Sequence, residues 1–438
     1  MGIPRFSLVR TGLAARRDWL EAMNLIAGSG APVQRAGIGM PVLVVQDPEA
    51  ARQVLVGDAA SYERPWIVKN IMSEGLSHTL FTSEGHEWLT RRQRVAPVFG
   101  RAQVDGLARI IASAIDDQIG AWKPGRAEDM QRDLTDLTLR VACRALLGAD
   151  SADDELGRVV RDRFEVLLAW ISHRFSHLAA PPAAVPTPRN RAMRAAKADL
   201  KDAVDQLVRR RREAGATSTD VLSLLLADQA GGDGPSDADI VGECIGFLFA
   251  GHETTASTLT WALYELATHP DIQAEVAAEG ARLDLGRPDL FDAVDQLSLI
   301  GRVADEILRL YPAGIGIARV AKTSTELCGH RVRRWTVILI AVYLIQRAPA
   351  WPDPHEFDPQ REFPTQPAGA GGAGYLPFGW GPRRCLGARF ATIETRLALA
   401  MICARWALTY EEPSPPRAGV MPSLRVDGAL PLRLDRRV

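Results

Sequence analysis

One cysteine set among glycines is the residue in this sequence best placed for chemistry. It stands in the stretch Phe378-Gly379-Trp380-Gly381-Pro382-Arg383-Arg384-Cys385-Leu386-Gly387, directly before an apolar helical segment. The backbone N–H groups and positive end of that helix favour thiolate over thiol at Cys385, and thiolate is the form that ligates iron. The glycines leave room for a flat cofactor, and Phe378 can shield the sulfur from water. The loop predicts a haem-binding cradle, in preference to an inert cysteine in a glycine-rich turn.

A long predicted helix supplies a second candidate surface. Ser236 is a suitable N-cap residue, and Asp239 stands at the N3 position. The helical pattern then continues to about residue 268, before Pro270. Two phenylalanines and a leucine at 247–249 are followed by small residues. One face in the middle of the helix is therefore cleared for something flat and bulky.

The cleared face carries the run Ala250-Gly251-His252-Glu253-Thr254-Thr255. The hydroxyl of Thr254 can bond back to the carbonyl of Ala250, which weakens the regular hydrogen-bond ladder and opens a polar notch. In that notch Thr254 and the carboxylate of Glu253 could pass protons to a ligand on iron. Taken alone, the run also fits ordinary small-residue packing with a Glu-Thr pair at the surface.

A basic helix predicted over residues 85–94 carries a tryptophan and an arginine one turn apart. Trp88 and Arg92 stand at i and i+4, hence on one face, where an indole N–H and a guanidinium could both donate to one haem propionate. Alone, the pair also fits an exposed basic helix with one buried tryptophan.

A carboxylate and two arginines are candidates for a structural cluster. Glu306 and Arg309 stand at i and i+3 near the end of a helix that stops at Pro312, and Arg361 follows downstream. A Glu-x-x-Arg pair by itself is most often a surface ion pair that contributes little. If the three side chains meet in the interior, they must be fully hydrogen-bonded. Their role would then be to hold the segment 363–375 rather than to do chemistry.

The composition is that of an ordinary globular protein. The chain has 438 residues, of which 47% are hydrophobic and 24% charged, and a net charge of −1 gives no reason to expect nucleic acid or an anionic membrane as partner. Its five cysteines include no Cys-x-x-Cys pair, which argues against a disulfide framework or zinc site and for a reducing compartment. Charges interrupt the first 26 residues. We therefore expect a soluble, cytoplasmic protein without signal peptide or membrane anchor.

The remaining patterns predict many helices and a few short strands. We expect helices over 13–26, 48–56 and most of 101–178, and strands over 41–45, 319–321, 327–332 and 336–343 in a mostly antiparallel sheet. The mixed segment 62–83 is expected to be an irregular loop over a pocket. The proline-rich stretch 179–188 is expected to be a loop between two helices that cover the pocket, and the last strands, within 421–434, to reach its roof.

The pattern Phe-x-x-Gly-x-Arg-x-Cys-x-Gly and the run Ala-Gly-x-Glu-Thr-Thr resemble the haem-ligand and oxygen-activation signatures of the cytochrome P450 family. Glu306, Arg309 and Arg361 match the structural triad of that family. The resemblance covers nearly the whole chain. It implies a mostly α fold with a small, mainly antiparallel β region: one triangular domain over 1–438, with haem b between the central helix and the helix after the cysteine loop. One departure is Arg333-Arg334-Trp335, where family members commonly have Pro-x-Gly, so the turn geometry there stays open.

The resemblance also implies roles for individual residues. Cys385 would be the axial iron ligand, and Arg319 and Arg383 would join Trp88 and Arg92 at the haem propionates. Residues 313–317 match a strand that lines the substrate pocket. The implied haem contacts are Cys385, Trp88, Arg92, Arg319, Arg383, Phe378, Gly379, Gly387, Ala250 and Gly251, and the implied pocket residues are Phe81, Phe247, Ala250, Ile315 and Ile317.

The activity implied is that of a monomeric monooxygenase resembling the soluble bacterial members of the family. It would use O₂ to hydroxylate a small hydrophobic or natural-product substrate in secondary metabolism. No flavin or iron–sulfur domain follows the cysteine loop, so electrons from NAD(P)H would come through a separate ferredoxin and reductase, or a flavodoxin-type donor. Arg383, Arg384 and Arg389, with Arg91 and Arg94, could form its basic dock.

Two other function classes stay open. A haem-thiolate enzyme could instead catalyse oxidative C–C or C–N coupling, or consume peroxide. A non-enzymatic haem sensor would not need Thr254.

Overall fold

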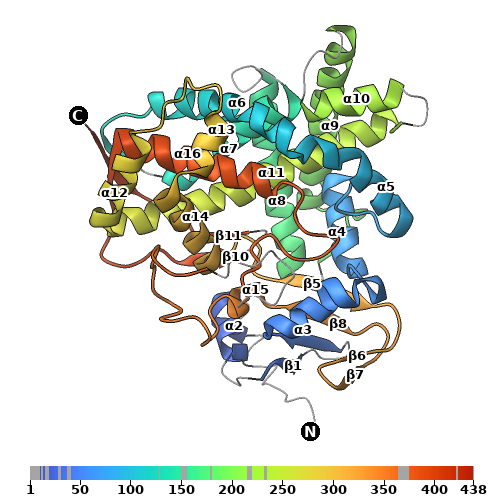
Figure 1. Cartoon of the computed structure of the whole chain (residues 1–438). Helices are drawn as coiled ribbons and strands as arrows, with labels where there is room; N and C mark the ends of the chain where they lie inside the picture. Colours follow the sequence, from blue (N-terminus) through green and yellow to red (C-terminus); the bar gives the residue numbers. More distant parts are fainter. Residues whose placement is uncertain are drawn as a thin grey trace. The chain divides into compact units, whose positions relative to one another are not determined.

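Helices make up most of the part of the chain that the structure describes (Figure 1). The computed structural model describes residues 10, 13–14, 19–27, 31–36, 41–127, 129–148, 155–177, 180–214, 220–230, 234–363, 374–420 and 423–437. The chain divides into two compact units, each assembled from three separate stretches. The first unit comprises 1–66, 302–386 and 416–428, and the second comprises 67–301, 387–415 and 429–438.

The first unit is built on a five-stranded sheet in the order β1-β2-β8-β5-β3. Its strands are β1 (Val33–Ala36), β2 (Val42–Val45), β3 (Tyr62–Glu63), β5 (Ile317–Ala321) and β8 (Val337–Ile340). Only the β2–β8 pair is parallel, and the other three pairs are antiparallel. Two hairpins complete the strands of this unit: β6 (Thr325–Leu327) with β7 (His330–Val332), and β10 (Ala418–Val420) with β11 (Leu424–Val426).

Short helices cover this sheet and close its core. They are α2 (Trp19–Ala27), α3 (Pro48–Arg52), which continues into a π-helical turn over Gln53–Gly57, and α15 (Val342–Ile345). Buried aliphatic side chains from the sheet, such as Val45 and Ile340, pack with Val54 and with Trp380 of the cysteine loop. The β-branched residues that favour a strand at 42–45 thus also form the core on which the loop rests.

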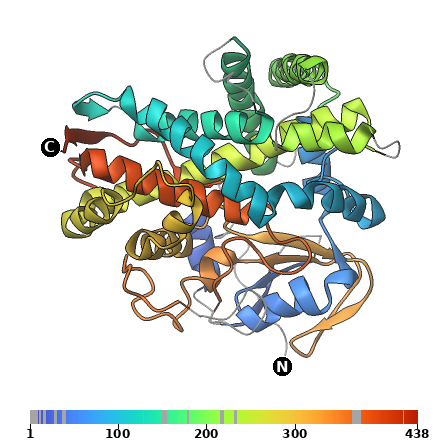
Figure 2. The ribbon, with the colours of Figure 1, turned by 45° about the horizontal axis from the view of Figure 1, so that its top comes forward.

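The second unit is a helical assembly around α11 (Asp237–Thr268). This helix packs against α7, α9, α10 and α16 (Figure 2). The other helices here are α5 (Gly85–Val95), α6 (Arg101–Gly120), α7 (Met130–Leu147), α8 (Glu155–Ser176), α9 (Pro188–Ala214), α10 (Val221–Ala230), α12 (Pro270–Gly280), α13 (Leu290–Asp295) and α16 (Ala388–Arg405). A three-stranded sheet, β4 (Gly125–Ala127), β12 (Leu432–Arg436) and β9 (Trp406–Thr409), has the order β4-β12-β9.

The central helix begins where the sequence predicts. The Ser236 hydroxyl accepts from the Asp239 N–H, and the Asp239 carboxylate accepts from the Ser236 N–H, which completes a capping box. The predicted mostly helical architecture with small, mainly antiparallel sheets is confirmed. Within the described residues, no helix has both the length and the apolar character needed to cross a membrane.

The segment 62–83 was predicted to be irregular, and that prediction is wrong. It contains β3 and an eleven-residue helix, α4 (Trp66–Leu76). Gly75 suggested a break, but a Cβ at this position would lie 3.0 Å from the side chain of Ile171. Gly75 is therefore a packing residue that lets α4 approach α8, and a single glycine near a helix end is tolerated for that reason.

Smaller differences concern the ends of elements. The helix predicted over 48–56 ends as an α-helix at Arg52 and continues as the π-helical turn. The strand predicted over 336–343 ends at Ile340, because the chain turns into α15 at Val342. Only Ile317 of the predicted strand 313–317 pairs in the sheet. Parts of five predicted segments lie outside the described residues: 15–18, 128 with 149–154 and 178, 179, 364–373, and 421–422.

The turn before β8 carries strain. Trp335 has a φ of 68°, a left-handed conformation that few non-glycine residues adopt, and its N–H donates to the carbonyl of Ala321 at 2.9 Å. The Arg334 guanidinium lies over its indole ring, 4.5 Å from the centroid. The sequence left this geometry open, and the structure shows a bulky residue at a position that glycine would favour.

A carboxylate and two arginines meet in the interior of the first unit. They come from α14 (Ser298–Leu310) and from the segment after residue 350. Glu306 accepts from Arg309 at 2.7 and 2.8 Å and from Arg361 at 3.1 Å, and the Glu306 and Arg309 side chains are fully buried. Arg309 also donates to the carbonyls of Gln346, Pro354 and Glu356. The charges are tolerated because each has several hydrogen-bond partners.

A second buried carboxyl lies between α16 and α11. Glu394 is 1% exposed, and its carboxyl shares a hydrogen bond with Thr255, while its Oε1 has no partner among the described residues. Burial raises the pKa of Glu394 well above its usual value of 4.5. The carboxyl of Glu394 therefore binds its proton more tightly in the folded protein than in the unfolded chain.

We predict that Glu306→Gln lowers the free energy of unfolding by about 3–5 kcal/mol, because two buried guanidinium groups lose their counter-charge. Urea unfolding followed by far-UV circular dichroism measures the change. Glu412→Gln is the control, since Glu412 forms an exposed ion pair with Arg126 and should shift stability by less than about 1 kcal/mol. A loss as small as the control's would contradict the buried cluster's structural role.

We also predict a pH signature from Glu394. A raised pKa in the folded state gives stability that is fully present below the unfolded pKa of 4.5 and is lost as the pH rises toward the folded pKa. Relative to wild type, Glu394→Gln should therefore gain up to roughly 1.4 kcal/mol per pH unit as the pH rises above the unfolded pKa of 4.5, until the folded pKa is passed. Urea titrations at several pH values measure this slope; equal slopes for both proteins would refute it, and Glu412→Gln should match wild type.

Candidate functional site

The cysteine loop is a rigid turn that leaves its thiol uncovered. The N–H of Cys385 donates to the carbonyl of Phe378 at 2.9 Å, and the N–H of Arg384 donates to the carbonyl of Gly381 at 3.0 Å. Trp380 is buried in the core of the first unit, whereas Cys385 is exposed. The loop is thus anchored by its tryptophan and presents its sulfur outward.

Backbone conformation requires two glycines of the loop, and packing against Leu55 also requires one of them. Gly379 and Gly381 have φ values of 68° and 74°, which favour glycine. A Cβ at Gly381 would lie 1.9 Å from the carbonyl oxygen of Leu55. Gly387 is different, because its φ is −83° and a Cβ there would meet only the Phe99 ring, at 3.9 Å. Backbone strain and protein packing do not explain Gly387, which fits a position kept small for a bound group.

The central helix is buried along its length except at one window. Between residues 240 and 263, all described, the only side chains not fully buried are those of Phe249, Ala250, Gly251 and Thr254. We call these four residues the α11 window. Ala250 and Gly251 stand about one turn before Thr254, Phe249 is next to them, and three of the four residues are apolar. An uncovered apolar strip in the middle of a buried helix fits the flat, apolar face of a macrocycle.

The polar notch predicted in this helix is present. The Thr254 hydroxyl donates to the carbonyl of Ala250 at 2.7 Å. Glu253 next to it is buried, with 6% of its surface exposed. A hydroxyl at the window and a buried carboxylate beside it form a pair that can hold and pass a proton.

His252 takes no part in this pair. Its Nδ1 bonds to the carbonyl of Leu248 at 2.6 Å, its ring packs against Phe164 at 5.2 Å, and burial lowers its pKa. A neutral, packed histidine stabilises the helix interior, and the hydroxyl and carboxylate beside it remain the groups available for proton transfer.

Trp88 and Arg92 lie on one face of α5, as their spacing predicts. The Arg92 guanidinium carbon is 5.6 Å from the centre of the Trp88 ring. Both side chains are partly exposed. Their arrangement fits two donors to one carboxylate of a bound group.

Arg91 on the same helix does not belong to a basic dock. Its guanidinium contacts the carboxylates of Glu87, Asp239 and Glu243 at 3.0, 2.6 and 2.8 Å, and its side chain is only 12% exposed. The expectation that it attracts an acidic partner protein is therefore wrong, because its charge is neutralised within the protein.

The site residues predicted from the sequence belong to both units, and the structure brings several of them together within each one. The first unit holds Cys385, Phe378, Gly379, Arg319, Arg383, Ile315 and Ile317, and the second holds Thr254, Glu253, Ala250, Gly251, Trp88, Arg92, Gly387, Phe81 and Phe247. In the first, Ile317 reaches the position of a Gly379 Cβ at 3.4 Å. In the second, Phe81 packs at Gly246, one turn before Ala250.

Sequence reasoning missed Glu243 and Glu394. Glu243 stands one turn after Asp239, and Arg91 one turn after Glu87, so each helix presents a pair on one face. That spacing is visible in the sequence, but the meeting of the two helices is not. Glu394 lies in an apolar helix, and its burial beside Thr255 depends on the same tertiary packing.

The residues present fit a haem. The exposed Cys385 of the first unit suits the iron, and in the second unit the α11 window suits the flat face and the pair on α5 the propionates, while Gly387 adds no side chain next to the cysteine. No group of three or more His, Cys, Asp or Glu suited to a metal ion exists among the described residues. A site with one thiolate ligand needs no such group, because the porphyrin supplies the other donors.

Comparison with known proteins agrees with this chemistry. The family model of cytochrome P450 matches residues 21–424. Among curated relatives, cyclooctat-9-en-7-ol 5-monooxygenase of Streptomyces melanosporofaciens is 33% identical over 367 residues, covering 82% of this chain and 79% of the relative. Pentalenene oxygenase of Streptomyces avermitilis is 29% identical over 395 residues, covering 89% and 87%.

A solved structure shows the same fold. The crystal structure of the cytochrome P450DA heme domain superposes with a TM-score of 0.85 at 24% identity, and the match covers 100% of this chain and 98% of that one. Together with the family match along most of its length, this shows that the chain belongs to the cytochrome P450 family and is a cytochrome P450 monooxygenase, whose family cofactor is haem.

Proposed function

We propose that this monooxygenase hydroxylates a hydrophobic natural product, with Cys385 as the thiolate ligand of haem b and Thr254 and Glu253 as its proton-handling pair. The observation that carries the proposal is the α11 window, where a mostly apolar strip and one hydroxyl are left uncovered on an otherwise buried helix. A sensor would need the apolar strip but not the hydroxyl.

Residues of this chain would hold the cofactor by distinct chemistry. Cys385 would bind the iron, while Trp88 and Arg92, with Arg319 and Arg383, would donate to the propionates. The small residues Ala250, Gly251, Gly379 and Gly387, with Phe378, would border the ring. Bound haem supplies the activation of O₂, and a thiolate ligand favours cleavage of the O–O bond.

Thr254 and Glu253 would control proton delivery. The Thr254 hydroxyl is bonded to the Ala250 carbonyl, so its oxygen lone pairs are left to accept a proton-bearing partner at the window. Glu253 is buried one residue away and would resupply the proton through water. General acid catalysis by such a pair speeds proton transfer by about 10²–10⁴-fold.

The substrate class rests on the apolar residues proposed for the pocket and on the relatives. Phe81 and Phe247 of the second unit are apolar, as are Ile315 and Ile317 of the first, and each suits contact with a hydrophobic substrate. The names of two relatives denote oxidation of an alkenol and of an alkene. Both observations support a compact, largely hydrocarbon substrate from secondary metabolism.

The chain would act as a monomeric, single catalytic domain that receives electrons from NAD(P)H through a separate ferredoxin-type or flavodoxin-type donor. Each of the two units is assembled from three separated stretches, which supports their folding together. Arg384 is exposed, and Arg383 is half-buried beside it. Since Arg383 is proposed as a propionate donor, Arg384 is the candidate for docking an acidic donor; Arg389 faces Asp105 at 3.6 Å.

We predict that Cys385→Ser abolishes the absorption band at about 450 nm of the reduced carbon monoxide complex, because a serine oxygen cannot replace the thiolate at iron. Difference spectroscopy of the purified holoprotein measures the band. Cys328→Ser is the matched control, since Cys328 is the other exposed cysteine among the described residues. A retained band in the Cys385 variant would overturn the assignment of the ligand.

We predict that Thr254→Ala lowers product formed per NADPH by about 100-fold, because the hydroxyl at the window is lost. The assay uses ferredoxin, its reductase and the alkene or alkenol that most strongly shifts the haem Soret band. Thr268→Ala is the control, since Thr268 makes the same backward bond, to Tyr264 at 3.2 Å, at the end of α11. Equal coupling in the Thr254 variant and wild type would contradict the proton-handling role.

A further inference from the structure

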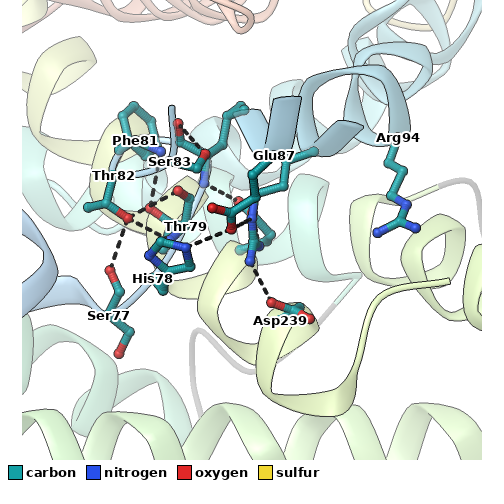
Figure 3. Close-up of polar contacts among 12 residues, drawn as sticks. Ser77, His78, Thr79, Phe81, Thr82, Ser83, Glu87, Arg94 and Asp239 are labelled. Atoms are coloured by element: carbon teal, nitrogen blue, oxygen red, sulfur yellow. Dashed lines mark hydrogen bonds and ion pairs between the residues drawn. The ribbon is translucent and has the colours of Figure 1, made fainter. Parts of the chain in front are cut away.

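Residues 77–83 form a compact turn whose polar groups bond mainly to one another (Figure 3). The N–H of Thr79 donates to the Thr82 hydroxyl at 2.8 Å, and the N–H of Phe81 donates to the Thr79 hydroxyl at 3.1 Å. Thr79, Thr82 and Ser83 are buried, whereas the Phe81 ring is partly exposed. The turn has a defined shape that presents one aromatic ring.

Two glycines of α11 let this turn lie directly on the helix. A Cβ at Gly242 would be 3.0 Å from the carbonyl oxygen of His78, and one at Gly246 would be 3.4 Å from the Thr79 side chain and 3.5 Å from the Phe81 ring. Both positions are one turn apart on the same face. Since Ala250 follows one turn later, Phe81 is placed next to the start of the α11 window.

A buried ion cluster fixes the turn in this place. The Glu243 carboxylate accepts from the Leu80 N–H at 3.1 Å and from Arg91 at 2.8 Å, and its side chain is 4% exposed. Arg91 reaches Asp239 at 2.6 Å and Glu87 at 3.0 Å, and His78 contacts Glu87 at 2.6 Å. The cluster therefore joins α5, α11 and the turn through one guanidinium and one carboxylate.

The ion cluster fixes the position of residues 77–83 more than it stabilises the fold. Burial raises the pKa of Glu243, while the Leu80 N–H and Arg91 oppose that shift. Desolvation of the two charges offsets much of their attraction, so a hydrophobic pair of similar volume would stabilise the fold about as well. A charged cluster, however, accepts only one geometry, because each oxygen of Glu243 has one directed partner.

We propose that Glu243 and Arg91 are positioning residues for substrate: they fix residues 77–83 on α11 and so set the distance of the Phe81 ring from the α11 window. The proposal rests on the proposed function, in which the window is where substrate is oxidised. The contacts of Glu243 with the N–H of Leu80, the residue before Phe81, carry the effect. Neither charged residue needs to touch substrate.

The experiment uses holoenzyme carrying Glu243→Leu, which removes the acceptor for Leu80 while Arg91 keeps Glu87 and Asp239. Hydrogen exchange of the peptide that covers 77–83 should become about tenfold faster, as loss of a charge-assisted bond predicts. Arg144→Met is the control, because Arg144 forms a partly buried ion pair with Asp117 at another helix contact. It should leave this peptide unchanged.

Two imidazole-type ligands of haem iron distinguish a change in the position of Phe81 from a general structural effect of the substitution. Imidazole alone binds haem iron without reaching far along the helix, whereas clotrimazole adds a bulky triaryl group. Glu243→Leu should raise the Kd of clotrimazole by about fivefold, the size of one lost aromatic contact, and leave that of imidazole unchanged. Glu243→Gln, which keeps an acceptor oxygen, should restore most of the affinity.

Phe81→Ala completes the test as a double-mutant cycle. If Glu243 acts through Phe81, Glu243→Leu has no further effect on clotrimazole binding once Phe81 is alanine. Gly242→Ala, whose added Cβ would lie 3.0 Å from the carbonyl oxygen of His78 without touching a charge, should displace the turn and reproduce the clotrimazole effect even if Glu243→Leu folds poorly. Additive effects, or faster exchange with unchanged clotrimazole affinity, would overturn the proposal. A wild-type protein whose Soret band imidazole does not shift would instead refute the proposed function.

Discussion

The close approach of Gly381 to the carbonyl oxygen of Leu55 is the contact on which the cysteine loop depends. No side chain fits at this position, so the loop lies directly against the backbone of the first unit and Trp380 enters its core. A thiol that must remain uncovered cannot be fixed by burying it. The loop resolves this by anchoring its other residues: the tryptophan supplies apolar burial, and two left-handed glycines turn the chain so that Cys385 stays exposed.

The central helix, like the cysteine loop, must be held firmly while part of its surface stays accessible. Between residues 240 and 263 it packs on α7, α9, α10 and α16, and only the α11 window is not covered by protein. A bound apolar group would bury this strip, which is worth about 25 cal/mol per Å². The hydroxyl bond from Thr254 to Ala250 falls within the same window. Function is thus concentrated where packing is incomplete.

Local patterns in the sequence predicted the features that depend on residues close together in the chain. The capping box at Ser236, the shared face of Trp88 and Arg92, and the turn of the cysteine loop follow from spacing and residue type. Helix α4 was missed because Gly75 indicated a break. This glycine instead leaves room for the side chain of Ile171 from α8. Arg91 was misassigned to a surface dock because two of its partners are distant in the sequence. Its three carboxylate partners come partly from a helix about 150 residues away, at separations of 148 and 152.

Buried carboxyls in this protein show how partners decide the role of a charge. Glu306 is held by two arginines whose remaining donors bond to backbone carbonyls, so it joins distant segments of the first unit. Glu394 has the Thr255 hydroxyl as its hydrogen-bond partner, and burial raises its pKa. Glu243 lies between these cases, since one arginine and one backbone N–H share it. Because the N–H belongs to the turn that carries Phe81, a charge whose net stabilisation is small can still determine which apolar surface lies beside the window.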